Sequence, residues 1–111
     1  MDHGNLSRLI EGSFDATLIR CHTAADVLAE LRRAAVDLVL VNRQFDQDLS
    51  DGIDLIRQLK ADPQWRATPC MLLTNFPEYQ QSAVAAGAEP GFGKRALSDP
   101  KTQELLARYL S

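Results

Sequence analysis

A run of apolar residues near the middle of the chain constrains the fold most. It extends from Val36 to Asn42, with a single charged residue, Asp37, near its start. A strand that is apolar at consecutive positions is typical of a parallel sheet covered on both faces. A second run of this kind begins at Cys70 and ends at Thr74. The sequence therefore predicts an α/β fold with a parallel sheet and helices on both sides.

Segments with helical periodicity lie between the strand-like runs. After Ser50, for example, Ile53, Ile56 and Leu59 recur at helical spacing until Pro63 ends the pattern. Asn5 and Ser50 are candidate N-caps. Helices are predicted at residues 5–12, 23–35, 53–61, 77–87 and 98–110, with further strands at residues 16–21 and, less well formed, 89–94. This alternation implies βαβ units with right-handed crossovers.

Three polar residues stand where predicted strands end. Asn42 and Thr74 close the two apolar runs, and Lys94 closes the short glycine-rich segment. In open parallel sheets, functional groups gather at the carboxyl ends of the strands. We therefore expect Asn42, Thr74 and Lys94 to share one cleft.

Length, charge and hydropathy exclude several classes of protein. A chain of 111 residues predicts one domain, residues 1–111. The net charge of -3 and the pI of about 5.2 provide no basic surface for nucleic acid. No apolar stretch approaches the roughly 20 residues of a membrane span, and the N-terminus lacks the layout of a signal peptide. The sequence predicts a cytoplasmic protein.

Neither a metal centre nor a catalytic set is indicated. Cys21 and Cys70 fall in two separate predicted strands, so we expect reduced core thiols. His3 and His22 are not near them in a zinc-ligand spacing. No Ser/His/Asp set, phosphate loop or dinucleotide fingerprint is present. We predict that the chain is not an enzyme and holds no cofactor and no metal.

In the order of its segments, from about residue 2 to 110, the chain resembles the receiver domain of bacterial response regulators. The resemblance implies a flavodoxin-like (CheY-like) fold, with a cleft that holds an acidic Mg²⁺-binding pair, an acceptor aspartate, a hydroxyl and a lysine. Thr74 and Lys94 match the hydroxyl and the lysine. Asp2 matches one member of the acidic pair.

Four departures from the receiver pattern are more informative than the matches. Asn42 stands at the acceptor position, and its neutral amide is a poor nucleophile and a weak metal ligand. The family's first strand, central in its 2-1-3-4-5 order, is absent. Arg95 replaces the proline that usually follows the lysine and helps to fix a cis peptide bond. Gly91 stands where the family often carries a switch aromatic, and the neighbouring Phe92 is expected to point into the core.

These departures predict an atypical receiver that acts through protein–protein contact without aspartyl phosphorylation. The resemblance places the partner surface on the last two helices and the segment between them. Its candidate residues are Tyr79, Glu89, Gly91, Phe92 and Tyr109. We expect a protein partner in a signalling pathway and a possible homo-oligomer, with no nucleic-acid or membrane partner.

Two other functions remain open from the sequence. In the first, a phosphorelay receiver uses Asp46 or Asp48 as a substitute acceptor, although both lie in a loop past the strand end. In the second, the vacated cleft binds a small molecule. Structural roles are also open for Thr74, which can satisfy a backbone group, and for Lys94, which can hold a loop.

The missing first strand leads to a prediction about association. If the strands at 16–21 and 36–42 pair directly, a four-stranded sheet in the family order 2-3-4-5 results. The helix at 5–12 then has less sheet to cover, which exposes Leu6, Leu9 and Ile10. The chain is then either self-associated through this apolar surface or part of a longer domain in which Met1 is not the true start.

Overall fold

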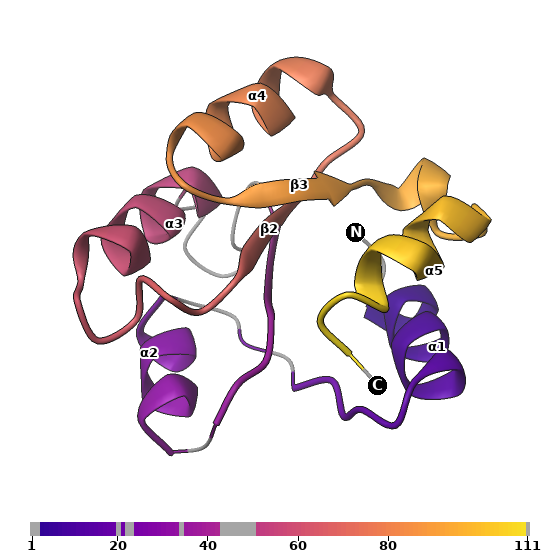
Figure 1. The fold of residues 1–111 in the computed structure, drawn as a ribbon, viewed down its shortest axis with the longest axis horizontal. Helices are drawn as coiled ribbons and strands as arrows, with labels where there is room; N and C mark the ends of the chain where they lie inside the picture. The colour runs from indigo at the N-terminus through magenta and orange to yellow at the C-terminus, as the bar shows by residue number, and fades with distance from the viewer. Residues whose placement is uncertain (1–2, 20, 22–23, 34, 43–50, 111) are drawn as a thin grey trace.

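The computed structural model describes residues 3–19, 21, 24–33, 35–42 and 51–110, and these form an α/β fold around a parallel sheet (Figure 1). The sheet contains β1 (Val39–Asn42), β2 (Cys70–Leu73) and β3 (Glu89–Phe92) in the order β1-β2-β3. Both pairings are parallel. The predicted fold class is confirmed, with a parallel sheet between two layers of helices.

Three helices cover one face of the sheet. They are α2 (Ala24–Arg33), α3 (Gly52–Ala61) and α4 (Pro77–Ala85). Their apolar side chains and the side chains on this face of the sheet form the first core cluster, whose buried members are Leu31, Val39, Val41, Ile53, Leu55, Ile56, Leu59, Cys70, Leu72, Ala83 and Ala88. The half-buried Trp65, in the loop after α3, packs against this cluster.

Two helices cover the opposite face. They are α1 (His3–Ser13) and α5 (Pro100–Leu106), which lie together in Figure 1. The 3-10 helix η1 (Lys94–Ala96) connects β3 to the segment before α5. The second core cluster contains Leu6, Ile10, Met71, Leu73, Phe92 and Leu106. Since consecutive residues of β2 belong to opposite clusters, its run of apolar residues is explained.

Local signals set several helix ends. The Asp51 and Asp99 carboxylates accept the N–H groups of Ile53 and Lys101, both at 2.9 Å, and so cap α3 and α5. Gly87, with a φ of 112°, ends α4 in the left-handed region that favours glycine.

Two expected N-caps fail. Asn5 lies inside α1, which begins at His3, so it is not the cap. Ser50 lies outside the described residues, and Asp51 is the cap of α3. None of the helices in the described part of the chain is long and apolar enough to cross a membrane.

The predicted strand at residues 16–21 does not form. Its described residues have no strand pairing, and the sheet of the described residues has three strands instead of four. The predicted exposure of α1 is also wrong, because Leu6 and Ile10 are only 6% and 3% exposed. They pack in the second core cluster, in which α5 contributes Leu106. A cavity of about 480 Å³ remains between the segment at 15–19 and β1.

Candidate functional site

The carboxyl edge of the sheet brings two predicted site residues together. Asn42 is the last residue of β1, is exposed, and stands in register with Leu73 of β2. Thr74 follows Leu73 directly. The backbone of Lys94 begins η1, two residues after the end of β3. The side chain of Lys94 and the whole of Asp2 lie outside what the structure describes.

The start of α3 lies against the end of β1. A Cβ atom at Gly52 would collide with the backbone oxygen of Asn42 and would lie 2.7 Å from Cγ1 of Val41. Only glycine therefore permits this approach without a shift of the backbone. The Asp51 carboxylate beside it is used as a helix cap, since it accepts the Ile53 N–H. Asp51 thus has a structural role at the start of α3.

No metal site is visible among the residues that are placed. In this part of the chain, no group of three or more His, Cys, Asp or Glu side chains could hold an ion. Asp46 and Asp48, the candidate substitute acceptors, lie outside the described residues, as does His22.

The Thr74 hydroxyl is engaged by its own loop. Its Oγ1 accepts the N–H of Phe76 at 3.2 Å, two residues along the chain. The Thr74 N–H donates to the backbone oxygen of Phe92 at 3.0 Å, which continues the pairing of β2 with β3. The structure therefore shows the local backbone role that the sequence left open for this hydroxyl.

Asn75 is a residue of this edge that sequence reasoning missed. Its Oδ1 accepts the backbone N–H of Arg95 at 3.1 Å, across 20 positions of sequence. Gly93 lies so close to Asn75 that a Cβ atom there would collide with Oδ1. The Arg95 N–H used here is the group that a proline lacks. The described residues contain no cis peptide bond.

Gln80 is a second residue that the sequence did not single out. Its Nε2 donates to the backbone oxygens of Leu72 at 2.8 Å and of Thr74 at 3.2 Å. Its Oε1 accepts the N–H of Gly91 at 3.0 Å. A single half-buried amide thus ties α4 to both β2 and β3, where the register of that strand pair shifts. A glutamine on a predicted helix gives no local signal of these distant partners.

Comparison with solved structures identifies the architecture. A putative response regulator from Chloroflexus aurantiacus aligns over 93% of this chain and 80% of its own, with a TM-score of 0.73 and 19% identity. The chemotaxis protein CheY4 of Vibrio cholerae aligns over 95% and 86%, with a TM-score of 0.70 and 20% identity. The receiver domain of NtrX from Brucella abortus aligns over 96% and 84%, with a TM-score of 0.70 and 22% identity.

The chain has the receiver fold. The comparison of structures shows the fold and nothing more. No protein-family model and no curated protein matches the sequence. The functional consequences of the receiver fold must therefore be argued from the residues at its carboxyl edge.

Gly91 leaves no space for an aromatic switch at its position. A Cβ atom on Gly91 would collide with the backbone oxygen of Leu72 and would lie 3.2 Å from Cβ of Met71 and 3.3 Å from Nε2 of Gln80. A larger side chain here would push β3 away from β2. The close packing of β3 against β2 therefore explains why a glycine stands at this position, where the receiver family often carries an aromatic residue.

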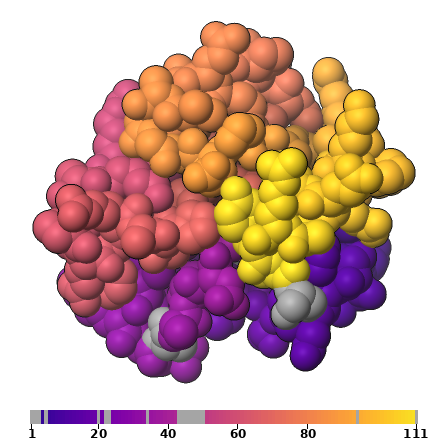
Figure 2. Space-filling model, viewed as in Figure 1, coloured from indigo at the N-terminus to yellow at the C-terminus, as the bar shows by residue number. Residues whose placement is uncertain are grey.

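The predicted partner surface is formed by α4, β3 and the C-terminal helix. Figure 2 shows the residues of α4 and of the C-terminal segment on the same face of the molecule, with those of β3 between them. Phe76 is 53% exposed, and its ring meets the half-buried ring of Tyr79 edge-to-face with 5.9 Å between centroids. Glu89 is exposed, and Gly91 is half-buried. The inclusion of Phe92 is wrong, because its side chain is buried in the second core cluster.

Tyr109 and Glu89 join the two ends of this surface. Loss of solvation raises the pKa of the Tyr109 phenol above its usual value, and the negative charge of Glu89 and a hydrogen bond to it raise this pKa further. Arg108 acts in the opposite direction. The neutral phenol beside the carboxylate holds the chain after α5 next to the start of β3.

Proposed function

We propose that this chain is a signalling domain of the receiver type that works without phosphorylation of an aspartate. The observation that carries the proposal is Asn42, which stands exposed at the carboxyl end of β1. This is the strand end at which the receiver resemblance predicts the acceptor carboxylate. An amide lacks the anionic oxygen that attacks phosphorus, so the usual transfer has no nucleophile.

The remaining cleft residues support a structural use of the site. Phosphoryl transfer needs a divalent cation, and Mg²⁺ prefers carboxylate oxygens as protein ligands. The sequence has only one counterpart to the family's acidic pair, and it is Asp2. The Thr74 hydroxyl is held by the Phe76 N–H, and Gly91 stands where a switch aromatic would respond. We infer that the cleft passes no phosphate-dependent signal.

The signal then leaves through protein contact. Two large apolar side chains are exposed at α4: Phe76, directly before the helix, and Val84 within it. The acidic residues Glu78 of α4 and Glu89 of β3 are also exposed. Aromatic anchors surrounded by polar groups are typical of protein interfaces. We propose a protein partner in a signalling pathway as the occupant of the surface formed by α4, β3 and the C-terminal helix.

Treatment with acetyl phosphate and Mg²⁺, followed by intact-mass measurement, tests the proposal. We expect no gain of one phosphoryl group, whereas a receiver that carries the acceptor aspartate shows it under the same conditions. Asn42→Asp alone should not restore full phosphorylation, because the metal-binding pair stays incomplete. A stable phosphoryl group on the unchanged chain would overturn the proposal, and peptide mapping would then show whether Asp46 or Asp48 carries it.

Ligand retention tests the other alternative. Native mass spectrometry of the purified chain should show the mass of the polypeptide alone. A bound small molecule that is lost on unfolding would favour the sensing function of the cleft over the partner-binding function.

A further inference from the structure

The register shift between β2 and β3 is bridged by a side chain of α4. In the pairing of the two strands, Leu72 of β2 stands opposite two residues of β3, Pro90 and Gly91. An extra residue in one strand interrupts the ladder of backbone hydrogen bonds. At this point Nε2 of Gln80 donates to the Leu72 oxygen at 2.8 Å, and its Oε1 accepts the Gly91 N–H at 3.0 Å. The Gln80 side chain therefore joins the strands where their ladder is irregular.

The Gln80 amide fits this site in one orientation. Its Nε2 also donates to the Thr74 oxygen at 3.2 Å, so both amide protons and the amide oxygen have partners. If the amide turned by half a rotation, its oxygen would face two backbone oxygens and its NH₂ group would face the Gly91 N–H. These contacts would be repulsive. The hydrogen bonds of the surrounding backbone therefore determine a single arrangement of the side chain.

Each residue of the loop before α4 makes a hydrogen bond that fixes the loop. The Thr74 hydroxyl accepts the Phe76 N–H at 3.2 Å. Oδ1 of Asn75 accepts the Arg95 N–H at 3.1 Å, which joins the loop to η1. The Phe76 oxygen accepts the Gln80 N–H at 3.2 Å in the first turn of α4. A second arrangement of the loop would have to break several of these bonds together, which disfavours local opening.

The same contacts position two aromatic rings of the proposed partner surface. Phe76 ends the loop, is 53% exposed, and meets the ring of Tyr79 edge-to-face with 5.9 Å between centroids. Tyr79 directly precedes Gln80 on α4. A side chain that is already ordered in the free protein loses less conformational entropy when a partner binds it. The groups that fix the loop therefore also prepare this part of the surface for binding.

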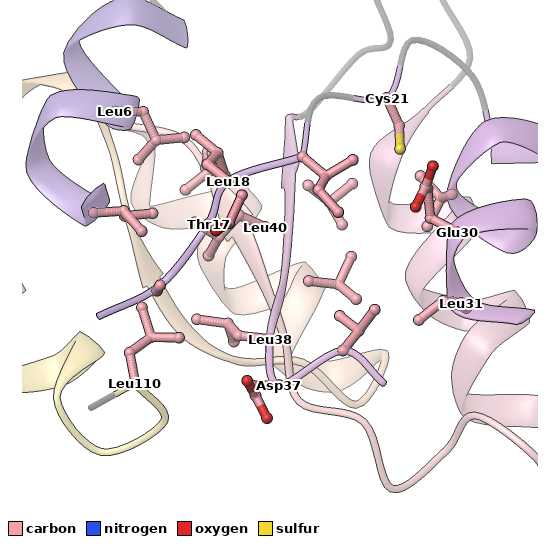
Figure 3. Close-up of a pocket in the computed structure, with 18 of the residues that line it drawn as sticks. Leu6, Thr17, Leu18, Cys21, Glu30, Leu31, Asp37, Leu38, Leu40 and Leu110 are labelled. Atoms are coloured by element: carbon pink, nitrogen blue, oxygen red, sulfur yellow. The ribbon is translucent and has the colours of Figure 1, made fainter. Parts of the chain in front are cut away.

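The cavity beside β1 is separate from this site. Residues such as Leu18, Leu38 and Leu40 surround it in Figure 3. None of the described residues that line the cavity belongs to α4 or β3. The hydrogen bonds of Gln80 therefore do not depend on what fills the cavity.

We propose that Gln80 and Asn75 are positioning residues, which hold the surface of α4 and β3 in a single conformation that binds its partner without prior modification of the chain. This inference rests on the proposed function, because it concerns the surface through which the signal leaves. A surface that is switched on and off needs an element with two arrangements, whose populations a signal shifts. Here the irregular strand pair, the loop before α4 and the first turn of α4 are joined by one set of hydrogen bonds. Binding is then controlled by the supply of the partner and not by a change of conformation.

NMR relaxation dispersion of the isotope-labelled whole chain tests the proposal, because it detects exchange between conformations on the μs–ms timescale. We expect no dispersion at the amides of Phe76, Tyr79 and Gly91. Gln80→Met keeps the length of the side chain but removes its amide. It should introduce dispersion at these positions and accelerate hydrogen exchange of the Gly91 amide about tenfold or more. Gln80→Glu should do the same, because a carboxylate cannot donate to the two backbone oxygens.

Control variants separate a positioning role from a general loss of stability. Ile56→Val shortens a fully buried side chain of α3 and lowers stability, but it should leave the three amides without dispersion. Gln81→Met, at the exposed neighbour of Gln80, should also leave them unchanged. Asn75→Ala removes the acceptor of the Arg95 N–H and should introduce dispersion at the Arg95 amide. Asn75→Asp keeps an oxygen at that place and should show the profile of the unchanged chain.

Three results would overturn the proposal. Dispersion at Phe76 and Gly91 in the unchanged chain would show that the surface already exchanges between conformations. Absence of dispersion in both Gln80→Met and Asn75→Ala would show that these side chains do not hold it, and if Gln80→Met does not fold, the two Asn75 variants decide. Dispersion of equal size in Ile56→Val would assign the effect to lost stability. Failure of the proposed function is a different result, namely the gain of one phosphoryl group on treatment with acetyl phosphate.

Discussion

Gln80 is predicted to contribute far more stability than its neighbour Gln81, although both are glutamines on α4. The Gln80 amide donates to the backbone oxygens of Leu72 and Thr74 and accepts the Gly91 N–H. Gln81 is exposed. The two positions therefore form a matched pair, in which the same substitution tests a half-buried clamp and a surface side chain.

The cost of Gln80→Ala follows from the groups that it leaves behind. The Gly91 N–H would lose its hydrogen bond to Oε1 of Gln80, and the Leu72 oxygen would lose the Nε2 donor at 2.8 Å. A buried polar group left unsatisfied costs about 1–3 kcal/mol. Because this site is half-buried and water can reach part of it, we expect a loss of about 1–3 kcal/mol in total. Gln81→Ala should change the free energy of unfolding by no more than about 0.5 kcal/mol.

Urea unfolding and thermal melting measure the difference. The helix propensity of alanine over glutamine is the same in both variants, so it cancels in the comparison. For a domain of this size, each 1 kcal/mol lowers the melting temperature by roughly 3–6 °C. Hydrogen exchange of the Gly91 amide should also accelerate in Gln80→Ala and stay unchanged in Gln81→Ala. Equal urea midpoints for the two variants would refute the argument that Gln80 joins α4 to the sheet.

Four further substitutions test the core and the turns. Leu72→Ala should cost about 2–5 kcal/mol, since Leu72 is fully buried. Leu40→Ala should cost clearly less, because Leu40 is half-buried at the cavity, and equal urea midpoints would contradict this. Burial raises the pKa of the Cys70 thiol from its usual value of 9.0, an effect that Lys60 partly offsets. Above that value the unfolded thiol ionises while the folded one keeps its proton, so the unfolded state binds fewer protons and stability falls as the pH rises. This fall should be smaller in Cys70→Ala, as measured by unfolding at a series of alkaline pH values. Gly87→Ala should cost about 1–2 kcal/mol in urea unfolding, because Gly87 has a φ of 112° and a Cβ atom there would lie 2.8 Å from Cγ of Lys60.

The end of α4 and the buried strands could be predicted because their signals are local, whereas the N-caps expected at Asn5 and Ser50 were wrong. The Schellman-type end of α4 illustrates this: the N–H groups of Gly87 and Ala88 donate to the oxygens of Val84 and Ala83, both at 3.0 Å. The glycine that permits this geometry stands in the sequence at the predicted stop. The apolar run of β2 similarly predicted burial on both faces, since every second residue of a strand enters the same layer.

Interactions between distant segments could not be predicted in this way. The residues at 16–21 have the composition of a strand, but a strand needs a neighbour with which to exchange backbone hydrogen bonds, and no local pattern supplies one. By contrast, the sequence did mark the site residues Asn42 and Thr74, because each of them ends an apolar run.

Only the tertiary structure decided which polar groups meet at the carboxyl edge. It placed the Asn75 amide on the N–H of Arg95, which is 20 positions away in sequence. It also placed the Gln80 amide between β2 and β3, where Gly91 is 11 positions away. An amide side chain has the same local preferences whether its partner is water or a distant strand, so the chain sequence alone carried no signal of these contacts. The apolar periods that determine the elements are local, whereas the partners of single polar atoms depend on how those elements pack.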